Sequence, residues 1–181
     1  MKETILTTYI TRDSYTDYVC EKYDIQNKEI TQTVIPSVDF SELDNHKWNI
    51  TLIVGNSGSG KSTILKQLGE IIEPKYDMSK SCISQFPMLS EDNVCDIFQS
   101  VGLSSVPTWL HTPNQLSNGE KARLDLAYSI IHTKDGEPIL VDEFTSVVNR
   151  NVALSMSYAL QRYLRNGDKK AIICSCHFDI I

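Results

Sequence analysis

The nine residues GNSGSGKST, at positions 55–63, constrain the fold of this chain more than any other segment. They follow an apolar run, WNITLIVG at 48–55, which predicts a buried strand. They open the segment KSTILKQLGEII at 61–72, whose apolar residues recur at helical spacing and predict a helix that ends before Pro74. A strand, a glycine-rich loop and a helix in this order are typical of a phosphate-binding loop in an α/β fold.

The loop fits the pattern GxxxxGK[ST] from Gly55 to Ser62. Its glycines let the backbone curl so that successive N–H groups point at phosphate oxygens, and the helix that follows adds its N-terminal dipole. Lys61 supplies a flexible cation for the β and γ phosphates, and the Ser62 hydroxyl is a hard oxygen ligand for Mg²⁺. The predicted nucleotide-binding residues are Gly55, Asn56, Ser57, Gly58, Ser59, Gly60, Lys61, Ser62 and Thr63.

Strands and helices alternate after the loop, which predicts an α/β fold with a mostly parallel sheet covered by helices. We expect strands at 81–84, 138–144 and 169–177, helices at 91–102, 118–133 and 151–167, and a loop at 106–115. The first 47 residues predict N-terminal strands and a short helix, in the segments ETILTTYIT, SYTDYVCEKYDI and EITQTVIPSVDF. The length of 181 residues suits a single domain over 1–181.

Two carboxylates end the apolar strand ILVDE at 139–143. Asp142 is placed to hold Mg²⁺ through water beside the phosphate loop, and Glu143 is placed to polarise an attacking water as a general base. A solvated acidic turn is the alternative, and without the phosphate loop it would be the simpler interpretation.

Several motifs in one order make the chain resemble the nucleotide-binding domain of ABC-type ATPases, which are P-loop NTPases. These are GNSGSGKST, the glutamine of CISQF (Gln85), LSNGE before a helix, the strand LVDE and the late histidine of CSCH (His177). The resemblance runs from about residue 48 to the end. It implies an ABC-type ATPase domain whose short helical subdomain covers 86–125.

The resemblance also implies a mechanism, in which two copies sandwich Mg-ATP head to tail and hydrolyse it to drive or switch a partner. Ser117, Asn118 and Gly119 of one copy would then face the γ-phosphate bound by the other. Gln85 would contact Mg²⁺ and the attacking water, and His177 would hold the water in line. The alternatives are an ordinary polar residue at a strand end for Gln85 and a partner of a C-terminal carboxylate for His177.

The sequence departs from the family pattern in four places. The signature is LSNGE rather than LSGGQ. Asn118 can tolerate a positive φ and so can replace glycine, and Glu120 adds a negative charge near the interface that could slow closure of the dimer. Asn149 replaces an aspartate, and only about thirty residues separate Gln85 from Ser117, where transporter domains carry a longer helical insert. The string DEFTSVVNR resembles a soluble branch of ABC ATPases, some of them fused to an acetyltransferase-like domain, so an acetyltransferase-like or other effector protein is a candidate partner.

Charge and hydropathy bear on location and partners. The net charge of −6 makes direct nucleic-acid binding unlikely but leaves it open, and no apolar run approaches the ~20 residues of a membrane span. We therefore expect a cytoplasmic protein with reduced, buried cysteines and no membrane insertion. The resemblance implies that it forms a homodimer. A membrane-transporter subunit and a DNA-maintenance or defence ATPase are the alternatives.

Overall fold

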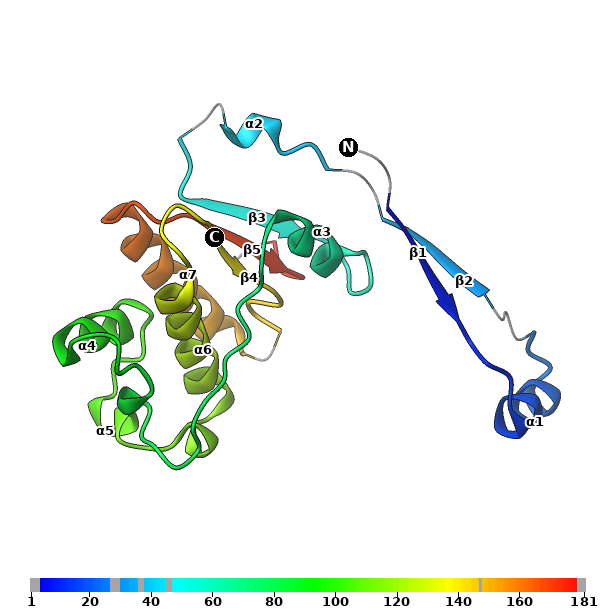
Figure 1. The fold of residues 1–181 in the computed structure, drawn as a ribbon, viewed down its shortest axis with the longest axis horizontal. Coiled ribbons are helices and arrows are strands. Elements are labelled where there is room, and N and C mark those ends of the chain that lie inside the picture. Colours follow the sequence, from blue (N-terminus) through cyan, green and yellow to red (C-terminus); the bar gives the residue numbers. More distant parts are fainter. Residues whose placement is uncertain (1–3, 27–29, 36–37, 45–46, 147, 179–181) are drawn as a thin grey trace. The chain divides into compact units, whose positions relative to one another are not determined.

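The computed structural model describes residues 4–26, 30–35, 38–44, 47–146 and 148–178 (Figure 1). Its backbone contacts divide the chain into two compact units, Met1–Glu42 and Leu43–Ile181. The single domain expected over 1–181 stays a prediction.

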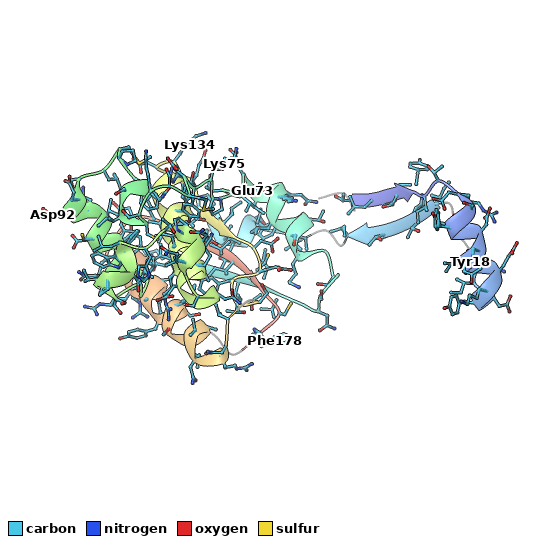
Figure 2. The ribbon with its side chains drawn as sticks, turned by 90° about the horizontal axis from the view of Figure 1, so that it is seen from below. Tyr18, Glu73, Lys75, Asp92, Lys134 and Phe178 are labelled. Carbon is cyan, nitrogen blue, oxygen red and sulfur yellow. The ribbon has the colours of Figure 1, made fainter. Side chains whose placement is uncertain are left out.

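The first unit is a two-stranded antiparallel ribbon with a helix between its strands. Strand β1 (Thr4–Tyr9) pairs with β2 (Ile30–Ile35), so that Ile5 lies opposite Val34. Helix α1 (Ser14–Tyr23) starts at a capping box formed by Asp13 and Thr16, and none of its residues is buried. The side chains of α1, Tyr18 among them, stand out around the helix, whereas those of the second unit are densely packed among themselves (Figure 2). The predicted strand, helix and strand are confirmed.

The second unit is built on a three-stranded parallel sheet. Strands β3 (Ile50–Val54), β4 (Ile139–Val141) and β5 (Ala171–Ser175) lie in the order β3-β5-β4. Val54 is paired with Ser175 and Val141 with Ile173. The predicted α/β fold with a parallel sheet is therefore confirmed.

Helices cover both faces of this sheet, which is why its strands are apolar without alternation (Figure 1). Ile172 and Leu140 pack with Leu65 of helix α3, whereas Ile173 and Ile139 pack in a larger cluster with helices α6 and α7. The three helices are α3 (Lys61–Leu68), α6 (Asn118–His132) and α7 (Arg150–Arg165). Helix α3 is shorter than predicted, because the chain leaves the helix at Gly69 and runs on without helical structure to Pro74.

The segment between α3 and α6 is helical in more places than predicted. Helix α4 (Glu91–Ser100) begins at its N-cap Ser90, as expected. The strand predicted at 81–84 is wrong, because the chain there forms a 3₁₀ turn, η1 (Ile83–Gln85). The loop predicted at 106–115 contains helix α5 (Val106–Trp109) and the 3₁₀ turn η2 (Pro113–Gln115). In each of these a proline stands in the first turn, where its fixed φ suits a helix.

The cysteines differ in exposure. Cys82 and Cys174 are buried, Cys20 and Cys95 are half-buried, and Cys176 is exposed, so the prediction of buried thiols is wrong for Cys176. Cys176 follows the last residue of β5 and has already left the covered part of the sheet. The described part of the chain contains no helix that is long and apolar enough to cross a membrane.

Candidate nucleotide-binding site

Three loops meet at one edge of the sheet because the carboxyl ends of parallel strands share an edge. The glycine-rich loop follows β3, the pair Asp142 and Glu143 follows β4, and the pair Cys176 and His177 follows β5. Strand β5 lies between β3 and β4, so Cys176 and His177, which follow β5, lie between the loop and the carboxylates. The structure thus gathers the predicted residues of the phosphate loop, both carboxylates and His177 at one edge.

The glycine-rich loop has the backbone geometry that a phosphate needs. Gly58 and Gly60 have φ values of 76° and 89°, in the left-handed region that favours glycine. A Cβ atom on Gly55 would lie only 2.6 Å from Ser59 Oγ, so a side chain at this position would require the Ser59 hydroxyl to move. Gly60 caps α3 without a side-chain hydrogen bond, which leaves N–H groups of the first turn available to phosphate oxygens.

The side chain of Lys61 folds back onto the start of the loop. This side chain is only 8% exposed, and Nζ donates to the carbonyl oxygens of Gly55 and Asn56, both at 2.8 Å. Nζ also lies 3.4 Å from Sγ of Cys176, which links the loop to the end of β5. The buried ammonium is thereby held where a phosphate in the loop would take over its hydrogen bonds.

The two carboxylates sit on a strained turn. Glu143 has a φ of 47°, which is unusual for a residue other than glycine, and its N–H donates to Asp142 Oδ1 at 2.9 Å. Such a conformation costs on the order of 1–3 kcal/mol and is typical of functional sites. The chain then rejoins the sheet, because the N–H of Phe144 donates to the carbonyl of Cys174 at 3.1 Å.

The donor atoms at this edge fit Mg²⁺ bound together with a nucleotide. Among the described residues no cluster of three or more His, Cys, Asp or Glu side chains is placed to hold a metal ion. Mg²⁺ ordinarily takes one or two protein oxygens and completes its shell with phosphates and water. Ser62, in the first turn of α3, and Asp142 supply oxygens of that kind.

His177 is tied to two hydroxyl groups that sequence analysis missed. Its Nδ1 lies 2.9 Å from Thr145 Oγ1, which lies 2.9 Å from Ser175 Oγ. The backbone N–H of His177 donates to the same Ser175 oxygen at 2.9 Å. Thr145 follows Glu143 by two residues, but nothing in the sequence distinguishes it from a surface threonine.

Gln85 is held within its own turn. The N–H of Asp77 donates to Gln85 Oε1 at 2.9 Å, and Gln85 Nε2 donates to the carbonyl oxygens of Asp77, Lys80 and Ser81 at 2.9, 3.1 and 3.2 Å. The structure therefore does not bring the Gln85 amide to the phosphate loop, and the predicted contact with Mg²⁺ and water requires these bonds to break.

Ser117 of the signature is also engaged. It is the N-cap of α6, and its hydroxyl donates to Glu120 Oε2 at 2.6 Å while its N–H donates to the same oxygen at 2.9 Å. Thr108 donates to the other oxygen of Glu120 at 3.1 Å. The hydrogen bonds from Ser117 lower the pKa of Glu120, so its charge is compensated inside a capping box instead of standing free.

The neighbours of Ser117 belong to the helix. Asn118 is the first residue of α6 and is not among the described residues with positive φ, so its tolerance for that conformation is not used here. Arg123 Nη1 donates to the carbonyl of Gly119 at 3.3 Å and Nη2 to Ser155 Oγ at 3.3 Å, which ties the signature to α7. Asn149 caps α7 by accepting from the N–H of Val152 at 3.0 Å.

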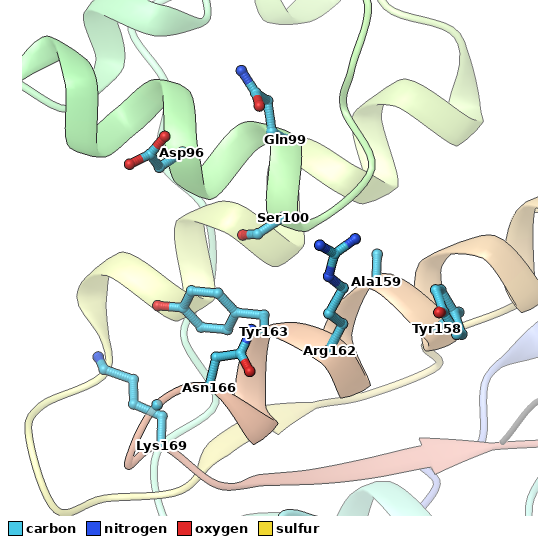
Figure 3. A pocket seen from close by; sticks show the side chains of 10 residues that line it. Asp96, Gln99, Ser100, Tyr158, Ala159, Arg162, Tyr163, Asn166 and Lys169 are labelled. Atoms are coloured by element: carbon cyan, nitrogen blue, oxygen red, sulfur yellow. The ribbon is translucent and has the colours of Figure 1, made fainter.

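A cavity of about 550 Å³ lies apart from these residues, between α4 and α7. Asp96 and Gln99 reach it from α4, and Arg162 and Tyr163 reach it from α7 (Figure 3). A smaller cavity of about 270 Å³ borders Asp142 and Glu143. The larger cavity contains none of the predicted site residues.

No family model matches the chain, but it is similar to known ATP-dependent transport proteins. It is 27% identical over 175 residues to an ATP-dependent lipid A-core flippase of Neisseria meningitidis serogroup A, covering 73% of this chain and 28% of the flippase. It is 27% identical over 164 residues to the macrolide export ATP-binding/permease protein MacB of Shewanella sp. (strain ANA-3), covering 67% of this chain and 25% of MacB. The chain thus matches only about a quarter of the length of these relatives.

Solved structures agree on the fold. An ATP-binding cassette of an ABC transporter superposes with a TM-score of 0.56 at 16% identity, covering 73% of this chain and 72% of that one. RNase-L inhibitor superposes with a TM-score of 0.52 at 21% identity, covering 71% of this chain and 29% of that one. These relatives give no support to an acetyltransferase-like partner. In its ordered motifs, its sequence relatives and its P-loop NTPase fold, the chain is similar to the nucleotide-binding domains of ABC-type ATPases.

Proposed function

We propose that the chain binds Mg-ATP at this sheet edge and hydrolyses it to ADP and phosphate. The observation that carries the proposal is the convergence of Lys61, the Asp142–Glu143 turn and His177 at the ends of three paired strands. Phosphoryl transfer asks mainly for positioning and for neutralisation of charge, and these side chains supply both.

Each residue has a proposed task. The amides from Gly55 to Gly60 and the Lys61 ammonium hold the phosphates, and Ser62 and Asp142 hold the Mg²⁺ that neutralises their charge. Glu143 accepts a proton from the attacking water, and its exposed carboxylate is free to reach it. His177 contacts the γ-phosphate from the neighbouring strand end.

The second half of the site is proposed to come from another copy. Ser117 and Gly119 stand at the start of α6, where the helix dipole favours the γ-phosphate of the nucleotide bound to the opposite copy. Binding would then close a head-to-tail dimer, and hydrolysis would open it to drive or switch a partner in the cytoplasm, where ATP is found. Gln85 would join only after leaving its turn.

A second candidate function is the ATP-binding component of a membrane transporter. The names of the relatives, a flippase and a macrolide exporter, favour it. The two candidate functions place different demands on the short segment between Gln85 and Ser117. A transporter component needs a surface there for its membrane subunits, whereas an ATPase that acts on another partner does not. If this protein stayed in the membrane fraction of its cells after a high-salt wash, the second candidate would be favoured.

The test is the mass in solution of Glu143→Gln, with and without Mg-ATP. Without its general base the protein should trap ATP, so we expect a monomer that becomes a dimer only when Mg-ATP is present. Glu137→Gln, which neutralises an exposed carboxylate away from the site, is the matched control and should not trap a dimer. A variant that binds ATP and stays monomeric would overturn the head-to-tail arrangement.

A further inference from the structure

Thr145, Ser175 and His177 form a closed ring of three hydrogen bonds at the carboxyl end of β5. Thr145 Oγ1 lies 2.9 Å from Ser175 Oγ and 2.9 Å from His177 Nδ1, and the N–H of His177 donates to Ser175 Oγ at 2.9 Å. Thr145 and Ser175 are each 1% exposed. Solvent therefore cannot accept their hydroxyl hydrogens, and the ring must satisfy its own donors.

The number of donors determines which group donates in each hydrogen bond of the ring. Each hydroxyl has one hydrogen to donate. Among the described residues Ser175 Oγ has two partners, and one of them, the N–H of His177, is itself a donor. The Ser175 hydrogen therefore goes to Thr145 Oγ1, and the Thr145 hydrogen goes on to His177 Nδ1. The opposite direction would leave the Ser175 hydrogen buried and unsatisfied, which is the costlier arrangement.

We propose that Thr145 and Ser175 are positioning residues that hold neutral His177 in the tautomer with its hydrogen on Nε2. Nδ1 accepts from Thr145, so the hydrogen sits on the other ring nitrogen. Nε2 has no partner within the described part of the chain, and His177 is only half-buried. An N–H group suits an anionic oxygen, whereas the lone pair of the other tautomer would repel it. The task assigned to Nε2, donating to the γ-phosphate, rests on the proposed function.

The tautomer is measurable without any activity. In protein labelled with ¹⁵N-histidine and held at about pH 8.5, where an ordinary imidazole is neutral, two-bond ¹H–¹⁵N spectra tell the two ring nitrogens apart. The chain has four histidines, and His177→Gln assigns the signal of interest. His132 is an internal control of the opposite kind, because its Nδ1 lies 2.9 Å from the carbonyl of Tyr128 and must donate. We expect hydrogen on Nε2 for His177 and on Nδ1 for His132.

Three variants complete the experiment. Thr145→Val keeps the shape and removes the donor, so we expect His177 to lose its single tautomer and kcat to fall about 10- to 100-fold with little change in the KM for ATP. Thr145→Ser should restore both. If Thr145→Val does not fold, Thr145→Ala serves in its place, because it removes the same donor to His177 Nδ1 and should also yield mixed tautomers.

The outcomes separate the two proposals. Hydrogen on Nδ1 of His177 in the unmodified protein would overturn the assignment, and so would a single Nε2 tautomer that persists in Thr145→Val. Mixed tautomers with unchanged kcat in Thr145→Val would overturn the task assigned to Nε2. Hydrogen on Nε2 in a protein that hydrolyses no ATP would leave the ring in place and overturn the proposed function.

Discussion

The sheet edge and the start of α6 carry the two halves of the proposed site, and they differ in how free their side chains are. At the sheet edge Glu143 is exposed and His177 Nε2 has no partner among the described residues. Around the helical segment, Gln85 and Ser117 are both engaged by close neighbours in the sequence. In the first half only Lys61, which donates to two loop carbonyls, must exchange internal hydrogen bonds for new ones, whereas in the second half both Gln85 and Ser117 must do so.

The difference follows from what positions each half. Backbone pairing of β3, β5 and β4 fixes the three strand ends relative to one another whether or not a ligand is present. The helical residues are polar groups near chain turns, and without a ligand such groups find local partners. This comparison predicts that removing a sheet-edge group costs activity, whereas removing a helical-half group also changes stability.

The largest expected effect is that of Lys61→Ala. Lys61 is the cation that neutralises charge on the phosphates, and loss of one such donor typically costs about 100-fold or more in rate. We expect ATP turnover to fall by at least that factor, with weaker binding of a fluorescent ATP analogue. Lys66→Ala, on an exposed position of the same helix, is the matched control. Equal turnover in the two variants would show that the loop does not hold the reacting nucleotide.

Next in size is the effect of Gln85→Ala on stability. The amide of Gln85 joins three backbone carbonyls and one N–H of its own turn, so we expect the free energy of unfolding to fall by about 1–3 kcal/mol in urea titrations. Gln99→Ala, at an exposed position on α4, should change it by less than about 0.5 kcal/mol. An unchanged free energy of unfolding in Gln85→Ala would mean that these hydrogen bonds of the Gln85 amide do not stabilise the fold. The difference in side-chain engagement between the two halves of the site would then be smaller.

Much of the fold could be predicted, because periodicity marks buried elements. Strand β3 and helices α6 and α7 lie within one or two residues of their predicted bounds. The strand predicted at 81–84 is wrong for a local reason, since the Gln85 amide donates to the carbonyls of Asp77, Lys80 and Ser81 and the chain forms a turn there. No periodicity of apolar residues records a side chain that bonds to its own backbone.

The parts of the site that depend on backbone geometry could be predicted from the sequence. The parts that depend on hydrogen bonds between side chains could not. Gly58 and Gly60 have the positive φ that the pattern requires, and the strand ends meet as parallel strands must. Thr145 and Ser175 are thirty residues apart in sequence, and only the pairing of β4 with β5 brings their hydroxyls together. The state of Ser117 depends on Glu120, which the sequence identifies only as a negative charge near the expected dimer interface.

A smaller effect is expected from Glu120→Gln. The Ser117 hydroxyl donates to a charged carboxylate, and such bonds are stronger than those to a neutral amide. The substitution should release the hydroxyl for a γ-phosphate, so we expect the Mg-ATP-dependent dimer to form at about 3- to 10-fold lower protein concentration. Sedimentation in the Glu143→Gln background measures this, with Glu137→Gln as the matched change of charge. A weaker dimer would mean that Glu120 itself contributes to the interface.

The smallest effect is the pH dependence of the same pair. Hydrogen bonds from the Ser117 hydroxyl and N–H hold the pKa of Glu120 below its ordinary value of 4.5 in the folded state. A carboxylate with a lowered pKa stabilises the fold fully above the unfolded value, and this contribution is lost as the pH falls through the folded value. The unmodified protein should therefore be more stable than Glu120→Gln at about pH 7, and urea titrations should show this advantage shrinking only below pH 4.5. Other carboxylates with lowered pKa, such as Asp77, are present in both proteins and cancel in the difference. A stability advantage that stayed constant down to about pH 3 would mean that a neutral Glu120 side chain holds Ser117 as well as a charged one does. The geometry of the capping box, and not the charge of Glu120, would then keep Ser117 engaged.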